Sequence, residues 1–223
     1  MNGRSLLARA GMFALFALFG CASSNPGENQ AESQSLVVKA ATTVDTMKES
    51  GGTKTAALLE KAKGVVIFPD LVKGGAVVGA SRGQGVLLAH GPHGWSDPAF
   101  YEATSISVGL QLGGEQSSVV MFLMDQPAVD SLLKSSSYSL KASGGLSMAD
   151  YNTANQQQLA GADIIVWSKS KGAYGGLTVS GSDLSQRFDL NNAFYGRALD
   201  AAEITAGAGK NAKANPLRKA LAG

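Results

Sequence analysis

Cysteine and histidine are nearly absent from this chain, which has one Cys and two His among its 223 residues. A single cysteine cannot form an intramolecular disulfide, so a disulfide-stapled fold is excluded. His90 and His93, even with Asp97, do not make a complete tetrahedral ligand set. We therefore expect solvated loop histidines, no metal site and no cofactor.

An excess of charge of one sign is also lacking, since 19 Lys and Arg stand against 17 Asp and Glu. A nearly neutral domain exerts no bulk electrostatic attraction on nucleic acid or on an anionic membrane. Nucleic acid is therefore not an expected partner. Any anion site must be a local cluster of basic side chains.

A long hydrophobic run is missing as well. Residues 10–19 are apolar, but the run is too short to span a hydrocarbon core of about 30 Å as a finished helix. Arg4 and Arg9 precede the run, a pattern typical of a secretory leader. The ending LFGC resembles the bacterial lipobox, at which cleavage leaves Cys21 as the new N-terminus. We predict a lipoprotein signal peptide over residues 1–20 and acyl chains, palmitate among them, on Cys21.

Removal of this leader, with its two arginines, would leave 17 basic residues against 17 acidic ones. Residues 21–35 are polar and small, which predicts a flexible tether of roughly 20 Å after the lipidated cysteine. Residues 36–206 have the length of a single domain. The Ala- and Lys-rich residues 207–223 are expected to be a frayed helix or tail.

Hydrophobic periodicity predicts the elements of that domain. Apolar residues recur at helical spacing from Val37 to Met47, and Gly51 and Gly52 are expected to end this amphipathic helix. Short helices are expected over residues 56–63, 126–134 and 192–203. Strands are expected over residues 65–68, 76–78, 86–88, 105–112, 119–124, 164–168 and 174–179.

Pro69 and Asp70 are expected to end the first of these strands, because proline lacks the N–H that a strand ladder needs. Short strands bracketed by helices predict an α+β fold. The sheet would be a twisted antiparallel sheet or partial barrel of short strands, packed with N-terminal amphipathic helices and a C-terminal helix.

Gly79, Ser81 and Gly83 satisfy the G-x-S-x-G pattern of serine hydrolases. That mechanism needs a strand, a sharp turn bearing the serine, and then a helix. Here Ser81 is expected in a hairpin that leads into another strand, and both histidines follow too closely for a triad. We predict that Ser81 is not catalytic and that the protein is not an enzyme.

Four blocks carry a family resemblance: residues 62–88, residues 94–100 (GWSDPAF), residues 105–124 and residues 164–182. In content and order they resemble the SYLF domain, a lipid-binding module of eukaryotes and bacteria. The resemblance implies phospholipid binding, with phosphoinositides as the ligands of eukaryotic members and actin as a partner of some. Residues 127–162 depart from the family pattern.

Four basic residues stand beside glycines at expected strand ends: Lys73, Arg82, Lys169 and Lys171. A cation together with exposed backbone N–H groups can hold a phosphate. These residues are the candidate site for lipid head groups. Unrelated solvated surface charges remain the alternative.

The sequence thus predicts an acyl-anchored bacterial envelope lipoprotein that binds membrane phospholipids, anionic or phosphoinositide-like. Ala22 after the cysteine favours the outer membrane, with the domain facing the periplasm or the cell surface. The alternative is a structural or protein-binding envelope lipoprotein with no lipid binding beyond its anchor.

Overall fold

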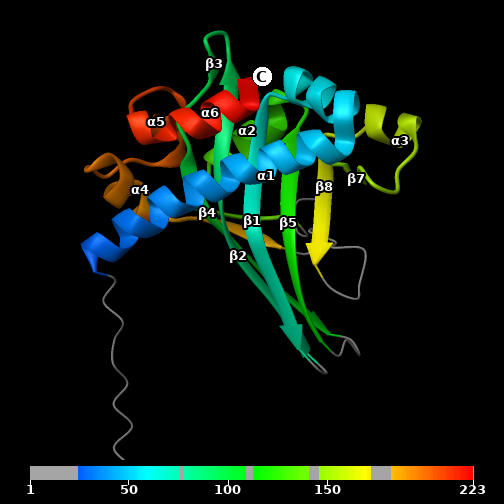
Figure 1. The fold of residues 1–223 in the computed structure, drawn as a ribbon, viewed down its shortest axis with the longest axis horizontal. Helices are drawn as coiled ribbons and strands as arrows, with labels where there is room; N and C mark the ends of the chain where they lie inside the picture. Colours follow the sequence, from blue (N-terminus) through cyan, green and yellow to red (C-terminus); the bar gives the residue numbers. More distant parts are fainter. Residues whose placement is uncertain (1–24, 76–77, 109–112, 141–145, 172–181, 223) are drawn as a thin grey trace, which may run out of the picture.

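The protein is represented by a computed structural model, which describes residues 25–75, 78–108, 113–140, 146–171 and 182–222. In these residues a curled sheet carries helices on both of its faces (Figure 1). The sheet has the strand order β6-β9-β4-β2-β1-β5-β8-β7, and β3 pairs with β2. Its pairings are antiparallel except for β7 with β8. The predicted α+β fold, with a twisted and mainly antiparallel sheet, is confirmed.

The strands are β1 (Gly64–Gly75), β2 (Val78–Gly91), β3 (Gly94–Trp95), β4 (Ala99–Val108), β5 (Gly113–Leu123), β6 (Ser137–Ser139), β7 (Met148–Asp150), β8 (Ile164–Lys171) and β9 (Asp183–Gln186). The helices are α1 (Pro26–Lys61), α2 (Gln126–Leu133), α3 (Gln156–Ala160), α4 (Phe188–Tyr195), α5 (Ala201–Thr205) and α6 (Asn215–Ala222), with a 3-10 turn, η2, over Ala212–Ala214. The predicted signal peptide, Cys21 and the strand predicted over residues 174–179 lie outside the described residues.

Helix α1 begins well before the predicted position. Asn25 caps it by accepting a hydrogen bond from the Gly27 N–H, and Pro26 occupies its first turn. Ser33 is fully buried, so the residues predicted to be a flexible tether are helical from Pro26 onward. That prediction was wrong because polar composition was weighed above the Asn-Pro helix-start signal.

Gly52 marks a kink in α1 instead of its end. Its φ of 56° and ψ of −141° are not helical, but the helix resumes and continues to Lys61. Glycine tolerates this left-handed φ because it has no Cβ. The two N-terminal helices of the sequence prediction are therefore the two halves of one kinked helix.

The first part of strand β1, residues 65–68, is buried on both faces, as its apolar run predicts. Val65 and Ile67 belong to the same core as Val37 and Met47 of α1, while Val66 and Phe68 belong to the opposite core. That second core is covered by α2 and α5, which contribute the side chains of Ala128, Val129, Leu132, Ala201 and Ile204. The sheet is thus the middle layer of the molecule.

Pro69 and Asp70 do not end β1. The register with β5 shifts between Phe68 and Leu71, and the strand then continues to Gly75. Such a bulge accommodates a proline that has no ladder hydrogen bond to give. The strand therefore runs beyond the span that α1 covers, so that its far end projects from the helical layer (Figure 1).

The C-terminal residues are part of the fold, in contrast to the predicted frayed tail. Leu217 and Leu221 are buried against the core on the α1 side. Lys48 of α1 donates a hydrogen bond to the carbonyl of Ala220. The helix predicted over residues 192–203 is likewise divided into α4 and α5, because Gly196 follows α4 with a left-handed φ of 69°.

Candidate functional site

The register of the sheet places two of the predicted basic residues in one row. Arg82 of β2 lies opposite Val72 of β1, Val72 lies opposite Gln116 of β5, and Gln116 lies opposite Lys171 of β8. Directly opposed residues share a face of the sheet. At about 4.8 Å per strand, the row from Arg82 to Lys171 covers roughly 14 Å, which is too wide for one phosphate group but suited to a surface contact.

Lys169 lies on the same face of β8 as Trp167, because side chains of a strand repeat with a period of two. This face is the one on which α1 lies, since Trp167 packs in the α1-side core. The backbone of Lys73 pairs with Ser81 and Glu115, one row away from the row of Arg82. The side chains of Lys73 and Lys171 lie outside the described part of the structure, so the described basic side chains of the candidate site are those of Arg82 and Lys169.

Arg82 does not stand alone. Its Nε forms an ion pair with Glu102 Oε1 on the neighbouring strand β4. The Arg82 side chain is 73% exposed and that of Glu102 is 15% exposed, so the guanidinium still faces solvent. Glu102 reduces the positive potential of Arg82, and only the pairing of β2 with β4 reveals this. Lys169 is exposed and has no ion pair with a described carboxylate.

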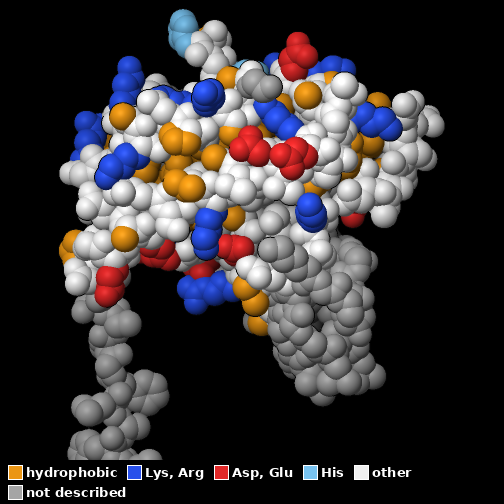
Figure 2. All heavy atoms as spheres, viewed as in Figure 1, with side chains coloured by type: hydrophobic (Ala, Val, Ile, Leu, Met, Phe, Trp, Pro, Cys, Tyr) orange, Lys and Arg blue, Asp and Glu red, His pale blue; other side chains and the backbone are white. Residues whose placement is uncertain are grey.

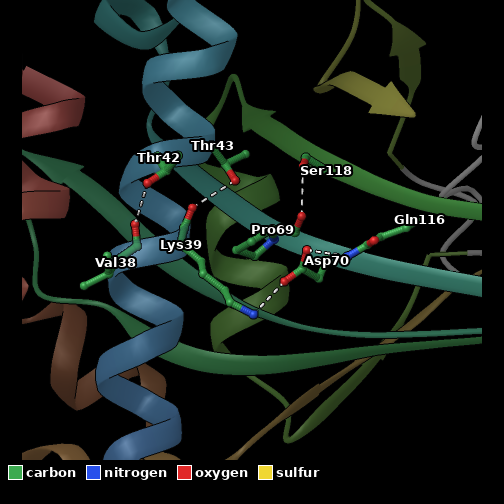
Figure 3. Close-up of polar contacts among 8 residues, drawn as sticks. All are labelled: Val38, Lys39, Thr42, Thr43, Pro69, Asp70, Gln116 and Ser118. Carbon is green, nitrogen blue, oxygen red and sulfur yellow. Dashed lines mark hydrogen bonds and ion pairs between the residues drawn. The ribbon is translucent and has the colours of Figure 1, made fainter. Parts of the chain in front are cut away.

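A hollow of about 380 Å³ lies between α1 and the bulged part of the sheet. Its lining residues are Leu36, Lys39, Asp70, Val72, Arg82, Gly83 and Gln84. Lys39 from α1 reaches Asp70 at the bulge, and Gln116 from β5 approaches the same carboxylate (Figure 3). Lys39 was not among the predicted site residues. Residues 39 and 70 are far apart in sequence, so no local pattern indicates that they are in contact.

Apolar side chains are exposed beside these charges. Val72 in the row of Arg82 is 54% exposed, and Val38 on α1 is 57% exposed. Figure 2 shows basic and acidic side chains interspersed over this side of the molecule, without a broad region of one sign. The site therefore combines scattered cations with an exposed branched apolar side chain.

Ser81 lies in β2, opposite Lys73 in the antiparallel pair that β2 forms with β1, as the predicted hairpin requires. Its side chain is buried, and its Oγ lies 2.5 Å from the Oγ of Ser105 on β4. The strand continues past it to Gly91, so a helix does not follow as a nucleophile turn requires. This geometry does not resemble that of a hydrolase serine.

The histidines lie around the β3 hairpin. The His90 ring stacks on Trp95 with 4.3 Å between the ring centroids, and its Nδ1 lies 3.1 Å from the carbonyl oxygen of Ala62. His93 is exposed. Over the described residues, His, Cys, Asp and Glu side chains do not gather in groups of three or more that would hold a metal ion. In the same residues, the search for a helix with the length and hydropathy to cross a membrane finds none.

Comparison with known proteins gives the family. A sequence profile of Ysc84, described as Las17-binding protein actin regulator, matches residues 104–223. SH3 domain-containing YSC84-like protein 1 of Bos taurus is 31% identical over 156 residues, which are 67% of this chain and 45% of that protein. LAS seventeen-binding protein 3 of Saccharomyces cerevisiae is 30% identical over 156 residues, 67% of this chain and 34% of that protein.

An SH3 domain-containing protein of Schizosaccharomyces pombe is 30% identical over 173 residues, 74% of this chain and 40% of its own length. The chain thus spans less than half the length of these relatives. On this evidence, the chain belongs to the Ysc84 (SYLF) family.

Proposed function

We propose that this protein is a bacterial envelope lipoprotein, anchored through Cys21, whose Ysc84 domain binds phospholipid head groups. The observation that carries the proposal is the exposed pair of Arg82 and Val72 in one row of the sheet, with the exposed Lys169 on the same face. Cations beside an exposed apolar side chain suit the boundary between head groups and acyl chains. The contact surface would be the α1-side face of the sheet where it extends beyond the helix.

The attraction of this surface for anionic lipid is weak on its own. A basic residue near an anionic membrane surface contributes about 1 kcal/mol, and Glu102 offsets part of the contribution of Arg82. Acylation at Cys21 would compensate, because a tethered domain meets lipid at a high effective concentration. With α1 starting at Pro26, residues 21–25 reach at most roughly 17 Å, which keeps the domain close to its anchor.

We also propose that the protein binds without catalysing a reaction. The burial of Ser81 in β2 and its hydrogen bond with Ser105 support this. A fluorophosphonate probe should not label the protein. Labelling that Ser81→Ala abolishes would instead establish a hydrolase.

A protein partner is the second candidate function. The family description names Las17 binding and actin regulation, and the yeast relative is named a LAS seventeen-binding protein. For this chain such a partner would be an envelope protein. The lipid proposal and the protein proposal differ in one measurement, which is whether the unlipidated protein associates with lipid alone.

That measurement is flotation of the Cys21→Ser protein with anionic and zwitterionic liposomes at low and high salt. The Cys21→Ser protein with an otherwise unchanged site should float with anionic liposomes. The floating fraction should fall at high salt, because salt screens the charges. A variant with Arg82, Lys169 and Lys171 changed to Gln should float less. A matched variant with the exposed Lys54, Lys61 and Lys213 changed to Gln should float as before.

The Lys73→Gln variant is a further comparison, because the register pairs Lys73 with Ser81 and not with the row of Arg82. It should float like the protein with an intact site. Equal flotation of the triple-site variant and its matched control would remove Arg82, Lys169 and Lys171 from the mechanism. Absence of flotation for all variants would favour the protein-binding alternative.

A further inference from the structure

A hollow separate from the row of Arg82 lies at the pole of the sheet that carries the β3 hairpin. It has a volume of about 830 Å³ and is walled by the β2–β3 hairpin, α2, α5 and the segment that leads to α6. Figure 1 shows this pole at the opposite end of the sheet from the projecting ends of β1 and β2. The hollow is therefore separate from the proposed lipid surface.

The charges in its lining are unbalanced. Three basic side chains, Lys63, Lys210 and Arg218, line it together with one carboxylate, Asp97. The whole chain, by contrast, has 19 basic and 17 acidic residues. The three basic residues come from the start of β1, the loop after α5 and helix α6, so the tertiary structure alone brings them together.

The carboxylate of Asp97 forms an ion pair with Arg218. It is only 4% exposed, and its Oδ1 lies 3.2 Å from Nη1 of Arg218. The backbone N–H of Asn211 also interacts with this carboxylate. Burial raises the pKa of Asp97 above its ordinary value, although Arg218 and Lys210 act in the opposite direction. Asp97 therefore holds Arg218 in place, and Lys63 and Lys210 are left exposed to solvent.

The rest of the lining is mixed: apolar side chains alternate with polar ones, among them His93 and Gln126. Val129 and Leu133 of α2 lie on one wall, and Ala202 and Ala206 lie on another. Trp95 of the hairpin is buried and stacked on His90, which fixes its ring at the wall. Apolar walls with a few convergent polar groups are the usual composition of a small-molecule site, and a volume of several hundred Å³ is typical of one.

We infer that this hollow binds a small organic anion, in which a phosphate or carboxylate group is joined to a short apolar body. The anionic group is held by Lys63 and Lys210, because Arg218, which also lines the hollow, is engaged with Asp97 and Asn215. The apolar body lies against α2 and α5. Charge-assisted hydrogen bonds to a phosphate or carboxylate are the strong ones, and the apolar walls select against inorganic ions.

The test uses the full chain in detergent solution and phenyl phosphate as the probe, with binding measured by isothermal titration calorimetry and by saturation transfer to the ligand. Inorganic phosphate and phenol are the comparison ligands. Phenyl phosphate should bind more tightly than either, because only it offers both parts of the proposed chemistry. Equal binding of phenyl phosphate and inorganic phosphate would overturn the apolar part of the inference.

Changing both Lys63 and Lys210 to Gln should weaken phenyl phosphate binding by about tenfold or more, since each lost charge-assisted hydrogen bond costs over about 1 kcal/mol. The matched control changes Lys54 and Lys134, exposed lysines outside the lining, to Gln. The control variant should bind like the unchanged chain. Both lysine pairs are exposed, so neither variant disturbs the core.

A second pair of variants tests the location without altering charge. Ala206 lines the hollow and is exposed, so Ala206→Trp should fill the space and abolish binding. Ala208 is exposed nearby but is outside the lining, so Ala208→Trp should leave binding intact. Failure of phenyl phosphate to bind at about 10 mM, or binding unchanged by both the lysine and the Ala206 variants, would overturn the inference. Neither outcome changes the interpretation of the liposome flotation, because that test concerns basic residues at the other end of the sheet.

Discussion

Lys39 of α1 and Asp70 of β1 form an ion pair, with 2.8 Å between Nζ and Oδ2. The other oxygen of Asp70 accepts a hydrogen bond of 2.7 Å from Gln116 of β5 (Figure 3). One carboxylate at the bulge of β1 therefore connects the helix to two adjacent strands. The two side chains of the ion pair are 56% and 40% exposed, so solvent screens their attraction.

The first prediction concerns this carboxylate. Asp70→Ala removes both contacts and should lower the free energy of unfolding by about 1 kcal/mol, measured by urea denaturation. Asp70→Asn keeps an oxygen that can accept from Gln116, so its loss should be smaller and should shrink in high salt. Asp130→Asn is the control, because its 3.9 Å pair with Lys134 lies on an exposed helix surface. An Asp70→Ala protein as stable as the control would contradict the prediction.

The second prediction concerns the close approach of β2 to β1 at Gly85. A Cβ on this residue would lie 2.4 Å from the carbonyl oxygen of Ile67 and 2.4 Å from Cδ1 of Phe68. Gly85→Ala should therefore destabilise the protein by about 1–3 kcal/mol through overpacking. Gly91→Ala, in the same strand, meets only a backbone oxygen of Gly94 at 3.9 Å and should change stability by less than about 0.5 kcal/mol. Denaturation curves that coincide for the two variants would disprove the clash.

The third prediction concerns the C-terminal segment. Leu217 is fully buried, so Leu217→Ala should lower the free energy of unfolding by about 2–5 kcal/mol. Lys219→Ala, on an exposed position of the same helix, should be nearly neutral. Thermal unfolding of both variants measures the difference. A Leu217→Ala protein with unchanged stability would mean that α6 does not contribute to the folded core.

The fourth prediction concerns pH. Arg187 donates two hydrogen bonds of 2.8 and 2.7 Å to the carboxylate of Asp189, and these lower the pKa of Asp189 below its ordinary value. A carboxyl group with a lowered pKa in the folded state stabilises the protein above its unfolded pKa, and this contribution is lost as the pH falls through the folded pKa. Asp189→Asn should therefore cost about 1 kcal/mol or less at neutral pH.

The stability difference between Asp189→Asn and the unchanged chain should shrink as the pH is lowered below about 4. Urea denaturation over a series of pH values measures it. A difference that grows toward acid would show that the sign of the effect is wrong.

The fifth prediction concerns the proposed anchor. Cys21→Ser should release the protein from membrane fractions into the aqueous phase on detergent partitioning. Stable anchoring takes at least two lipid signals, which lipoprotein processing at this cysteine would supply. If the Cys21→Ser protein enters the detergent phase as fully as the unchanged chain does, the anchor must be elsewhere.

Local patterns in the sequence determined the fold class and much of the sheet. The uninterrupted apolar run of residues 65–68 predicted a strand covered on both faces, and all four side chains are buried. The pattern worked because burial of a strand depends on each residue's own hydrophobicity and on the period of two. Element ends were less predictable. The strand predicted over residues 86–88 is part of the longer strand β2, Val78–Gly91, which pairs with β1 and β4; residues 76 and 77 of the other predicted strand lie outside the described residues.

Contacts between residues far apart in sequence were decided by the tertiary structure alone. Strand register places Arg82 and Lys171 in one row and Lys73 in another, and a shift of one residue would reverse this division. It also sets Glu102 beside Arg82, which no local pattern shows. Composition and periodicity therefore determine which segments form a buried sheet, because those properties are local. Which charges meet on its surface depends on pairing between distant segments, and that is fixed only when the whole sheet assembles.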